Sequence, residues 1–260
     1  MILALILGTA AIGLMINAFG DGQTETTDPV GEDGLRVTGS DEGDLLKGQD
    51  GDDRFFGKDG ADLLIGQDGA DQLFGAEGAD TLLGGTGDDL LRGGVQGDLL
   101  IGDLGADQIL GDGGDDTIIS AAILDDSAMA QQVAQATYAD QITPEFDYRT
   151  DLDASDHVDG GPGQDDITFG SDDSVSGGDD ADLLRAGDWI APGQPATITD
   201  YDAQEDVLVY SHAGDAPDIT AQVDDQGTAT VFADGRAVLI IPNAGPDFDP
   251  DQVMLELRHA

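Results

Sequence analysis

The sequence predicts an all-β protein in which short parallel strands stack into a solenoid. A nine-residue unit repeats nine times between Gly39 and Ile119, without insertion or deletion. Every copy has glycine at its first position, aspartate at its sixth and a large apolar residue at its eighth. A fixed period of this kind is typical of architectures in which each unit stacks on its neighbours.

The unit Gly84–Arg92 (GGTGDDLLR) shows the full pattern G-G-x-G-x-D-x-U-x, where U is a large apolar residue. The sixth-position aspartates are Asp44, Asp53, Asp62, Asp71, Asp80, Asp89, Asp98, Asp107 and Asp116. The eighth-position residues are Leu46, Phe55, Leu64, Leu73, Leu82, Leu91, Leu100, Ile109 and Ile118. Three columns without an exception make this a specific signal.

Each column has a chemical role. Glycine at positions one and four permits positive φ and close backbone stacking, which tight turns require. The eighth residue has outward-pointing neighbours in a period-two strand, so it points between the sheets. Ca²⁺ binds carboxylate and carbonyl oxygens, and one aspartate per stacked turn supplies them. The sequence therefore predicts several Ca²⁺ sites, with the nine aspartates above as ligands.

These repeats resemble those of the RTX (repeats-in-toxin, hemolysin-type) family, which builds a right-handed parallel β-roll. The resemblance implies that the first six residues of each unit form a calcium-binding turn and the last three form a short strand. It also implies that two successive units make one coil, so that odd and even units lie on opposite sheets. Calcium ions are the partners that this resemblance implies.

Composition excludes several functions. The chain has 260 residues, with 55 acidic against 9 basic side chains and a formal net charge of −46. Nucleic acid and anionic lipid headgroups are bound through basic surfaces, so no nucleic-acid partner is expected. There is no cysteine, and the three histidines are far apart in the sequence. No H-E-x-x-H or G-x-S-x-G motif occurs, so we do not expect an enzyme.

The N-terminal segment Met1–Phe19 is almost wholly apolar. It predicts a hydrophobic helix that is nearly long enough to cross a bilayer, which takes ~20 residues. This helix is either a retained membrane anchor or a cleaved signal. A buried start is a further alternative. Residues 20–38 form an acidic, flexible tether without basic residues before Arg36, which favours an exterior location for the acidic body.

After the nine repeats, residues 120–150 interrupt the period and predict an inserted helix or loop, with the helix at about 125–139. Residues 151–185 form a second, partly degenerate block that we expect to continue or restart the same roll. Its calcium candidates are Asp165 and Asp182, with Asp156 in a degenerate unit less certain. The stretch FGSDDSVS within this block reads as irregular.

Residues 186–260 predict a β-rich cap. The expected strands are Ala196–Thr199, Val207–Tyr210, Ile219–Val223, Thr228–Phe232 and Ala237–Ile241, with hairpin turns at 224–227 and 234–235. The segment resembles the one that closes the solenoid in RTX proteins, because a bare terminal layer exposes its core. In that family this region often carries a signal for type I secretion, which competes here with membrane anchoring.

Three positions of the repeat leave questions open. Position four is Glu42 in the first unit and Gln96 in the seventh, so calcium geometry is least certain in those turns. Position three is acidic in the first five units, where solvated carboxylates are favoured over extra ligands. Position nine is mostly apolar and points outward, so it requires cover, with the C-terminal segment as first candidate and a partner or self-association as the alternative.

The sequence thus predicts a calcium-binding, exported or surface-anchored bacterial protein with a structural or interaction role. The repeat block has a small core and a large negative charge, so we expect its folding to be coupled to Ca²⁺ binding. The alternative function is an extracellular adhesive or polysaccharide-binding module, which an apolar or aromatic groove on the roll would favour. An RTX-associated enzyme is less favoured.

Overall fold

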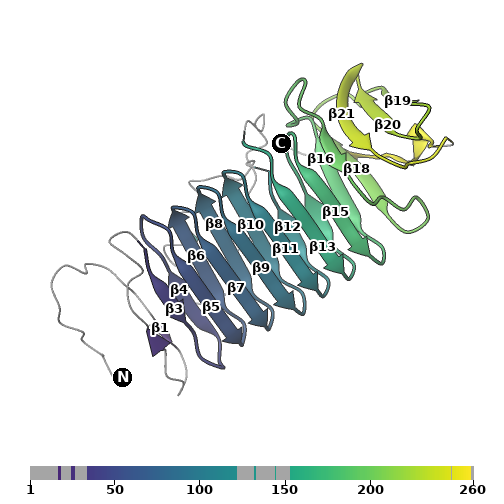
Figure 1. Cartoon of the computed structure of the whole chain (residues 1–260). Coiled ribbons are helices and arrows are strands. Elements are labelled where there is room, and N and C mark those ends of the chain that lie inside the picture. The colour runs from purple at the N-terminus through teal and green to yellow at the C-terminus, as the bar shows by residue number, and fades with distance from the viewer. Residues whose placement is uncertain are drawn as a thin grey trace.

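Two long, mostly parallel β-sheets face each other along a rod (Figure 1). The structure is a computed structural model that describes residues 17–18, 25–26, 34–121, 132, 144, 153–246 and 248–258. Successive strands alternate between the sheets, so that each sheet takes every second unit. The all-β parallel solenoid predicted from the repeat is confirmed.

Sheet A has ten strands and sheet B has twelve among the described residues. Sheet A contains, in spatial order, β1 (Asn17–Ala18), β4 (Asp44–Lys47), β6 (Leu63–Asp68), β8 (Thr81–Thr86), β10 (Leu99–Leu104), β12 (Thr117–Ile119), β14 (Asp166–Thr168), β16 (Leu183–Gly187), β18 (Val207–His212) and β22 (Met254–Leu257). Sheet B contains β2 (Glu25–Thr26), β3 (Arg36–Thr38), β5 (Arg54–Asp59), β7 (Gln72–Glu77), β9 (Leu90–Val95), β11 (Gln108–Gly113), β13 (His157–Pro162), β15 (Ser174–Asp179), β17 (Ala196–Ile198), β21 (Arg236–Ile241), β20 (Ala229–Ala233) and β19 (Ile219–Val223).

The register keeps equivalent positions of the repeat side by side. Leu64 on β6 lies beside Leu82 on β8, two units further along the chain. The stacking continues past the insertion, because Ile118 on β12 pairs with Ile167 on β14. The strands that follow residue 153 therefore extend the same two sheets.

The eighth-position column forms the centre of the core. These nine side chains are no more than 1% exposed. Val158, Ile167, Val175 and Leu184 continue the column in the second block. The prediction that position eight points between the sheets is confirmed.

The irregular reading of FGSDDSVS holds for residues 169–173 but was wrong for the last three residues. Ser174–Asp179 forms β15, and Val175 pairs in register with Val158 on β13. The layer is retained although its turn is one residue shorter, since Asp173-Ser174-Val175 keeps the D-x-U spacing.

The conformational role of glycine differs from the expectation. Position four has positive φ, as predicted, for example Gly69 at 140°. Position one does not, whereas position two does from the third unit onward, for example Lys58 at 91°. Position one requires glycine because of close contacts: a Cβ on Gly66 would lie 2.0 Å from the Asp71 Oδ2 and 2.6 Å from the Gly84 carbonyl oxygen.

The C-terminal segment closes the far end of the rod (Figure 1). Strands β19, β20 and β21 form an antiparallel meander, and β21 joins sheet B through β17. Strand β22 follows the 3₁₀ turn Pro250–Gln252 and adds to β18 at the end of sheet A. The five predicted strands are confirmed, and β22 is an additional one.

Position nine behaves differently on the two sheets. On sheet A, Ile65, Leu83, Ile101 and Ile119 are at most 8% exposed and belong to a second, smaller apolar cluster. On sheet B, Phe56, Phe74 and Leu110 are only half-buried. The C-terminal strands extend the ends of the sheets instead of lying over these faces (Figure 1), so the expectation that they supply the cover was wrong.

Most of the predicted N-terminal helix, Met1–Phe19, lies outside the described residues. Its two described residues, Asn17 and Ala18, form β1 antiparallel to β4, so the helix does not include them. Within the described part of the chain, no helix is long and apolar enough to span a membrane. The helix predicted at 125–139 also lies outside the described residues, apart from Gln132.

Candidate calcium-binding turns

The sixth-position aspartates form two ladders along the rod, one beside each sheet. In each ladder the Oδ1 of one aspartate accepts a hydrogen bond from the backbone N–H of the aspartate one layer earlier. The distance is 2.7 Å from Asp53 N to Asp71 Oδ1 and 2.8 Å from Asp80 N to Asp98 Oδ1. One oxygen of each carboxylate therefore ties neighbouring layers together.

All eleven predicted aspartates belong to these ladders. The ladder of sheet A contains Asp44, Asp62, Asp80, Asp98, Asp116, Asp165, Asp182 and Asp206. The ladder of sheet B contains Asp53, Asp71, Asp89, Asp107, Asp156 and Asp173. Asp156, the less certain candidate, also belongs to a ladder. Asp173 and Asp206 were not predicted, although each begins a D-x-U triplet in the sequence.

The second carboxylate oxygen is unpaired along the middle of both ladders. Nine ladder aspartates, a set that does not include Asp156, have a buried Oδ2 with no hydrogen-bond partner: Asp62, Asp71, Asp80, Asp89, Asp98, Asp107, Asp116, Asp165 and Asp182. These residues are no more than 4% exposed. A buried acceptor without a donor costs about 1–3 kcal/mol, and more when it is charged. The repeated pattern indicates a missing positive partner.

A hard cation fits the oxygens around these turns. The same glycine Cβ position that meets the Asp71 Oδ2 also meets a carbonyl oxygen of the next layer, so oxygens of two layers converge there. No group of three or more acidic, histidine or cysteine side chains gathers among the described residues. Each turn therefore offers one carboxylate with backbone carbonyls, which is oxygen chemistry suited to Ca²⁺.

Burial makes these carboxyl groups poor acids in the metal-free fold. Desolvation is the main cause, and the hydrogen bond from the adjacent layer partly opposes it. The pKa is raised to about 6 for Asp71, Asp80 and Asp165, to about 7 for Asp62, Asp107, Asp116 and Asp182, and to about 8 for Asp89 and Asp98. A bound cation would reverse this effect by favouring the ionised form.

The two turns with a substituted fourth position differ from each other. Gln96 adopts a φ of 78°, as a glycine would, and Asp98 in its unit has an unpaired Oδ2 like its neighbours. In the first unit, the Asp44 Oδ2 instead accepts hydrogen bonds from Ser40 N and Oγ, at 2.5 and 3.0 Å. The seventh turn is thus regular and the first is not.

The third-position acids point outward. Asp41, Asp50, Asp59, Asp68 and Glu77 are all exposed. The Asp68 Oδ1 accepts a hydrogen bond from the Thr86 hydroxyl at 2.9 Å. Their exposure agrees with the expectation of solvated carboxylates.

Comparison with known proteins supports the repeat assignment. The family model of the RTX calcium-binding nonapeptide repeat matches residues 36–64, 47–82 and 83–118. The nonapeptides of this chain are therefore RTX calcium-binding repeats, as the sequence resemblance predicted. No curated protein sequence matches the chain.

Two solved structures align over most of the chain at low similarity. The solution structure of the AlgE6R3 subunit from the Azotobacter vinelandii mannuronan C5-epimerase is 16% identical, covering 90% of this chain and 86% of that one, with a TM-score of 0.22. The crystal structure of the extracellular lipase LipA from Serratia marcescens is 16% identical, covering 89% of this chain and 40% of that one, with a TM-score of 0.29. Because these TM-scores are low, the fold assignment rests on the strand pairing described above.

Proposed function

We propose that the chain is a calcium-dependent structural rod whose repeat region folds when Ca²⁺ binds. The observation that carries this proposal is the series of nine buried, unpaired carboxylate oxygens inside RTX turns. The role is one of binding and support, not catalysis, which agrees with the lack of nucleophile and histidine motifs in the sequence.

The two oxygens of each ladder aspartate have different roles, and these roles show where a cation would bind. The ladder aspartates hold layers together through Oδ1 and leave Oδ2 for the cation. Bound Ca²⁺ supplies positive charge inside turns of a chain whose net charge is −46. Without it, like charges face one another along each ladder, as between Asp89 and Asp107. Metal binding and folding are therefore linked in the same equilibrium.

Circular dichroism of the full chain during calcium titration tests this proposal. We expect a β-sheet spectrum with saturating Ca²⁺ and a large loss of that signal in EDTA, restored by added Ca²⁺. Magnesium at the same concentration should restore much less, because it demands octahedral geometry and keeps its water. A far-UV spectrum unchanged by EDTA would contradict the proposal.

We also propose that the protein acts outside the cell or at its surface. The supporting features are the apolar segment Met1–Phe19, the strongly acidic body and the need for a calcium-rich compartment. Fractionation of cells producing the full chain, with protease added to intact cells, tests the location. Recovery of the chain in the cytoplasmic fraction, with protection from protease added to intact cells, would contradict the proposed location.

A second candidate, a polysaccharide-binding role, is favoured by a groove on the outer face of sheet B. The groove has a volume of about 770 Å³, and its lining includes Phe56, Phe74 and Arg92. The rings of Phe56 and Phe74 stack with centroids 4.8 Å apart, and the guanidinium of Arg54 lies 4.9 and 5.4 Å from them. Arg92 pairs with Asp112, and Glu77 and Asp159 also line the groove, so the feature that suits a sugar ring is the aromatic pair with Arg54 beside it.

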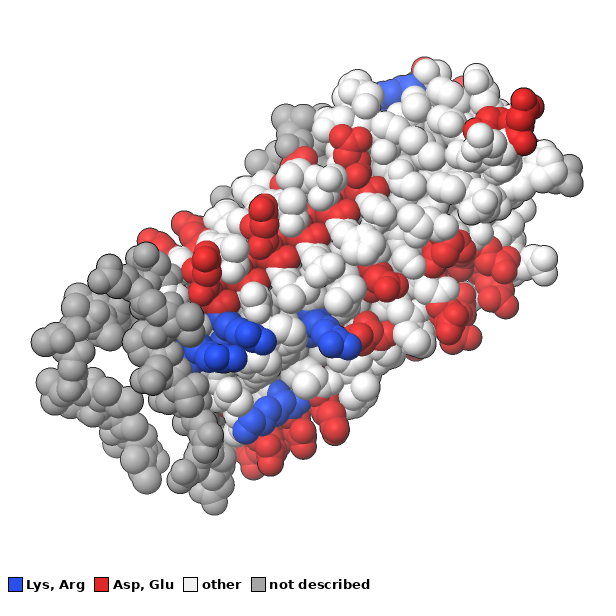
Figure 2. Space-filling view, in the orientation of Figure 1, with Lys and Arg blue, Asp and Glu red and all other residues white. Residues whose placement is uncertain are grey.

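The charge distribution also favours this surface. Arg36, Arg54, Lys58 and Arg92 all lie on β3, β5 and β9, among only nine basic residues in the chain. Figure 2 shows basic atoms gathered near the N-terminal end of the roll, while acidic atoms form separate patches along the rest of the visible face.

A glycan array probed in Ca²⁺ and in EDTA tests this second candidate. The variant Phe74→Ala should weaken binding at least about tenfold, or ~1.4 kcal/mol. Leu104→Ala is a matched control, because Leu104 is an exposed apolar residue on β10 outside the groove lining. Equal binding by both variants, or no binding to any array member, would rule out a role for this groove.

A further inference from the structure

The RTX turns of this chain fall into two groups according to the backbone at position two. In nine units that residue has a left-handed φ between 67° and 127°. They are Lys58, Gln67, Ala76, Gly85, Gly94, Asp103, Asp112, Gly161 and Gly178. Five of the nine are not glycine, although side chains make this conformation unfavourable.

The same nine units contain the nine aspartates whose Oδ2 has no partner. Asp71, for example, follows Gln67 in its turn, and Asp98 follows Gly94. The turns with a left-handed residue at position two are therefore the same turns in which the Oδ2 has no hydrogen-bond partner. In these turns the N–H of position two does not satisfy the carboxylate, which remains available to a cation.

The first two units have the opposite arrangement. Ser40 and Gln49 at position two lie outside the left-handed region, and each donates its backbone N–H to the Oδ2 of its own unit's aspartate. The distances are 2.5 Å from Ser40 N to Asp44 and 3.0 Å from Gln49 N to Asp53. In addition, Leu35 N donates to the Asp53 Oδ1 at 2.6 Å.

At the C-terminal end of each ladder, the Oδ2 of the last aspartate also accepts hydrogen bonds from the protein. On sheet B, the Asp173 Oδ2 accepts hydrogen bonds from the Ser120 hydroxyl and from Gly170 N, both at 2.7 Å. On sheet A, the Asp206 Oδ2 accepts one from Asp202 N at 2.7 Å. The Oδ2 of all four terminal carboxylates thus has a donor from the chain itself, whereas the Asp44 Oδ1, with no earlier layer of the ladder to donate to it, is buried without a partner.

We infer that calcium binds only at the nine interior turns, whereas Asp44, Asp53, Asp173 and Asp206 are metal-free ends sealed by protein hydrogen bonds. This inference rests on the proposed calcium-dependent role and specifies its sites. It removes Asp44 and Asp53 from the ligands expected from the repeat pattern. The physical reason is competition: an N–H donor and a cation cannot both occupy the same lone-pair region of one oxygen.

Matched substitutions in neighbouring layers of one ladder test the inference. Asp71→Asn removes an interior carboxylate and Asp53→Asn removes a terminal one, and both lie on sheet B one layer apart. Bound Ca²⁺ per chain is measured by equilibrium dialysis with elemental analysis, at a calcium concentration where circular dichroism shows a folded chain. We expect Asp71→Asn to bind at least one ion fewer and to shift the calcium midpoint upward by about tenfold. Asp53→Asn should keep the wild-type count.

Loss of an ion by Asp53→Asn, or no loss by Asp71→Asn, would overturn the inference. If either variant does not fold at saturating calcium, the pair Asp44→Asn and Asp62→Asn on sheet A gives the same comparison with the same expected outcome. A wild-type chain that binds no Ca²⁺ would instead refute the proposed function, so the two failures are distinguishable.

Discussion

The nonapeptide region, residues 39–119, and the C-terminal region, residues 186–258, are stabilised in different ways. The nonapeptides bury one principal side chain per nine residues and keep unpaired carboxylates inside their turns. The C-terminal region continues the same apolar cluster with additional side chains that include Trp189, Tyr210, Val231 and Ile241. We therefore expect the same two sheets to pass from a part that depends on metal to a part that does not.

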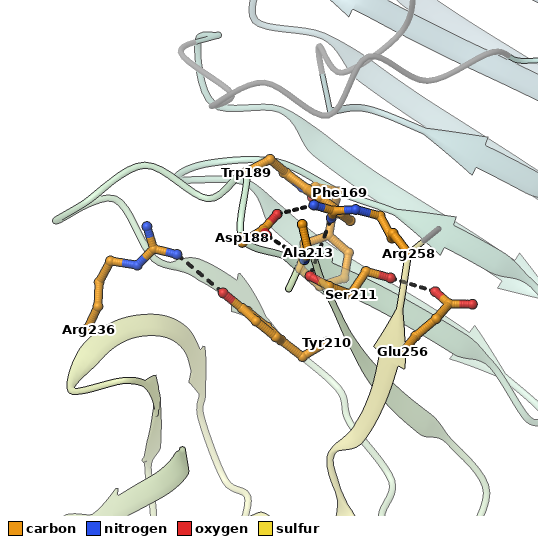
Figure 3. Close-up of polar contacts among 9 residues, drawn as sticks. All are labelled: Phe169, Asp188, Trp189, Tyr210, Ser211, Ala213, Arg236, Glu256 and Arg258. Atoms are coloured by element: carbon orange, nitrogen blue, oxygen red, sulfur yellow. Dashed lines mark hydrogen bonds and ion pairs between the residues drawn. The ribbon is translucent and has the colours of Figure 1, made fainter. Parts of the chain in front are cut away.

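Several polar side chains in and beside the C-terminal region are paired with one another (Figure 3), although the buried His212 Nδ1 has no hydrogen-bond partner. The Trp189 indole donates to the Phe169 carbonyl at 2.9 Å. The Arg258 guanidinium forms an ion pair with Asp188 and lies 5.2 Å from the Trp189 ring. These contacts hold the chain just after β22 against sheet A. We expect this chain to meet the same need, partners for buried polar groups, by bound ions in one region and mainly by its own side chains in the other.

Removal of calcium should separate the two regions and has the largest expected effect. In EDTA we expect hydrogen exchange of residues 39–119 to become nearly as fast as in an unfolded chain. Residues 207–241 should keep most of their protection, because their core needs no metal. Hydrogen–deuterium exchange with mass spectrometry measures both regions in one sample. Equal loss of protection in both would show that the rod is a single cooperative unit.

The pH dependence of the metal-free chain should be opposite to that of the calcium-bound chain. Burial raises the pKa of the interior ladder aspartates above the unfolded value, as at Asp89 and Asp98, to about 8. A raised folded pKa gives stability that is present at low pH and lost as pH rises through the folded value. In EDTA, the β-sheet signal should therefore grow on acidification from pH 8 toward pH 5.

With calcium present the sign reverses, since protons compete with the metal for the same oxygens. The calcium midpoint should therefore rise as the pH falls over this range. Circular dichroism titrations at several pH values measure both trends. Parallel pH trends with and without calcium would contradict the assignment of these carboxylates as ligands.

A methyl group at position one should damage the interior turns. In Gly66→Ala the added Cβ meets the Asp71 Oδ2 and the Gly84 carbonyl at distances below 3.0 Å, so the ladder must shift. We expect a loss of about 3 kcal/mol in the free energy of unfolding with calcium bound, together with weaker calcium binding. Chemical denaturation in saturating Ca²⁺ measures the first effect.

Gly235→Ala in the β20–β21 hairpin is the control for this variant. No atom lies within 4 Å of its added Cβ, but its φ of 76° is left-handed. Its cost should be about 1 kcal/mol, with no change in the calcium midpoint. A change in that midpoint as large as that of Gly66→Ala would show that the effect is not specific to the ladder.

The smallest expected effect is the loss of the Arg258 contacts. The Arg258 side chain is only 10% exposed, and it joins an ion pair to a cation–π contact. Arg258→Ala should destabilise the chain by about 1–2 kcal/mol and increase hydrogen exchange mainly in β22. Arg92→Ala breaks the exposed pair with Asp112 and should cost no more than about 1 kcal/mol. Equal costs would indicate that β22 is held by its backbone pairing instead.

Much of the fold and of the site was predictable because the repeat places similar residues in similar environments. The eighth column predicted the core, and the sixth column predicted the ladders. The prediction failed where the unit changed length. Asp173 was hidden because its turn lacks one residue, and Asp206 because it lies beyond the repeats. A search for D-x-U triplets at relaxed spacing would have found both.

The sequence by itself determined the period, the alternation of two sheets and the column of carboxylates. These follow from local chemistry, since every unit repeats the same side chains. Only the tertiary structure decided which carboxylates keep an unpaired oxygen. That choice depends on donors from distant parts of the chain, such as Ser120 for Asp173, and on the backbone conformation of each turn. Pairing between layers is a long-range property, so the repeat pattern could not distinguish an interior turn from a sealed end.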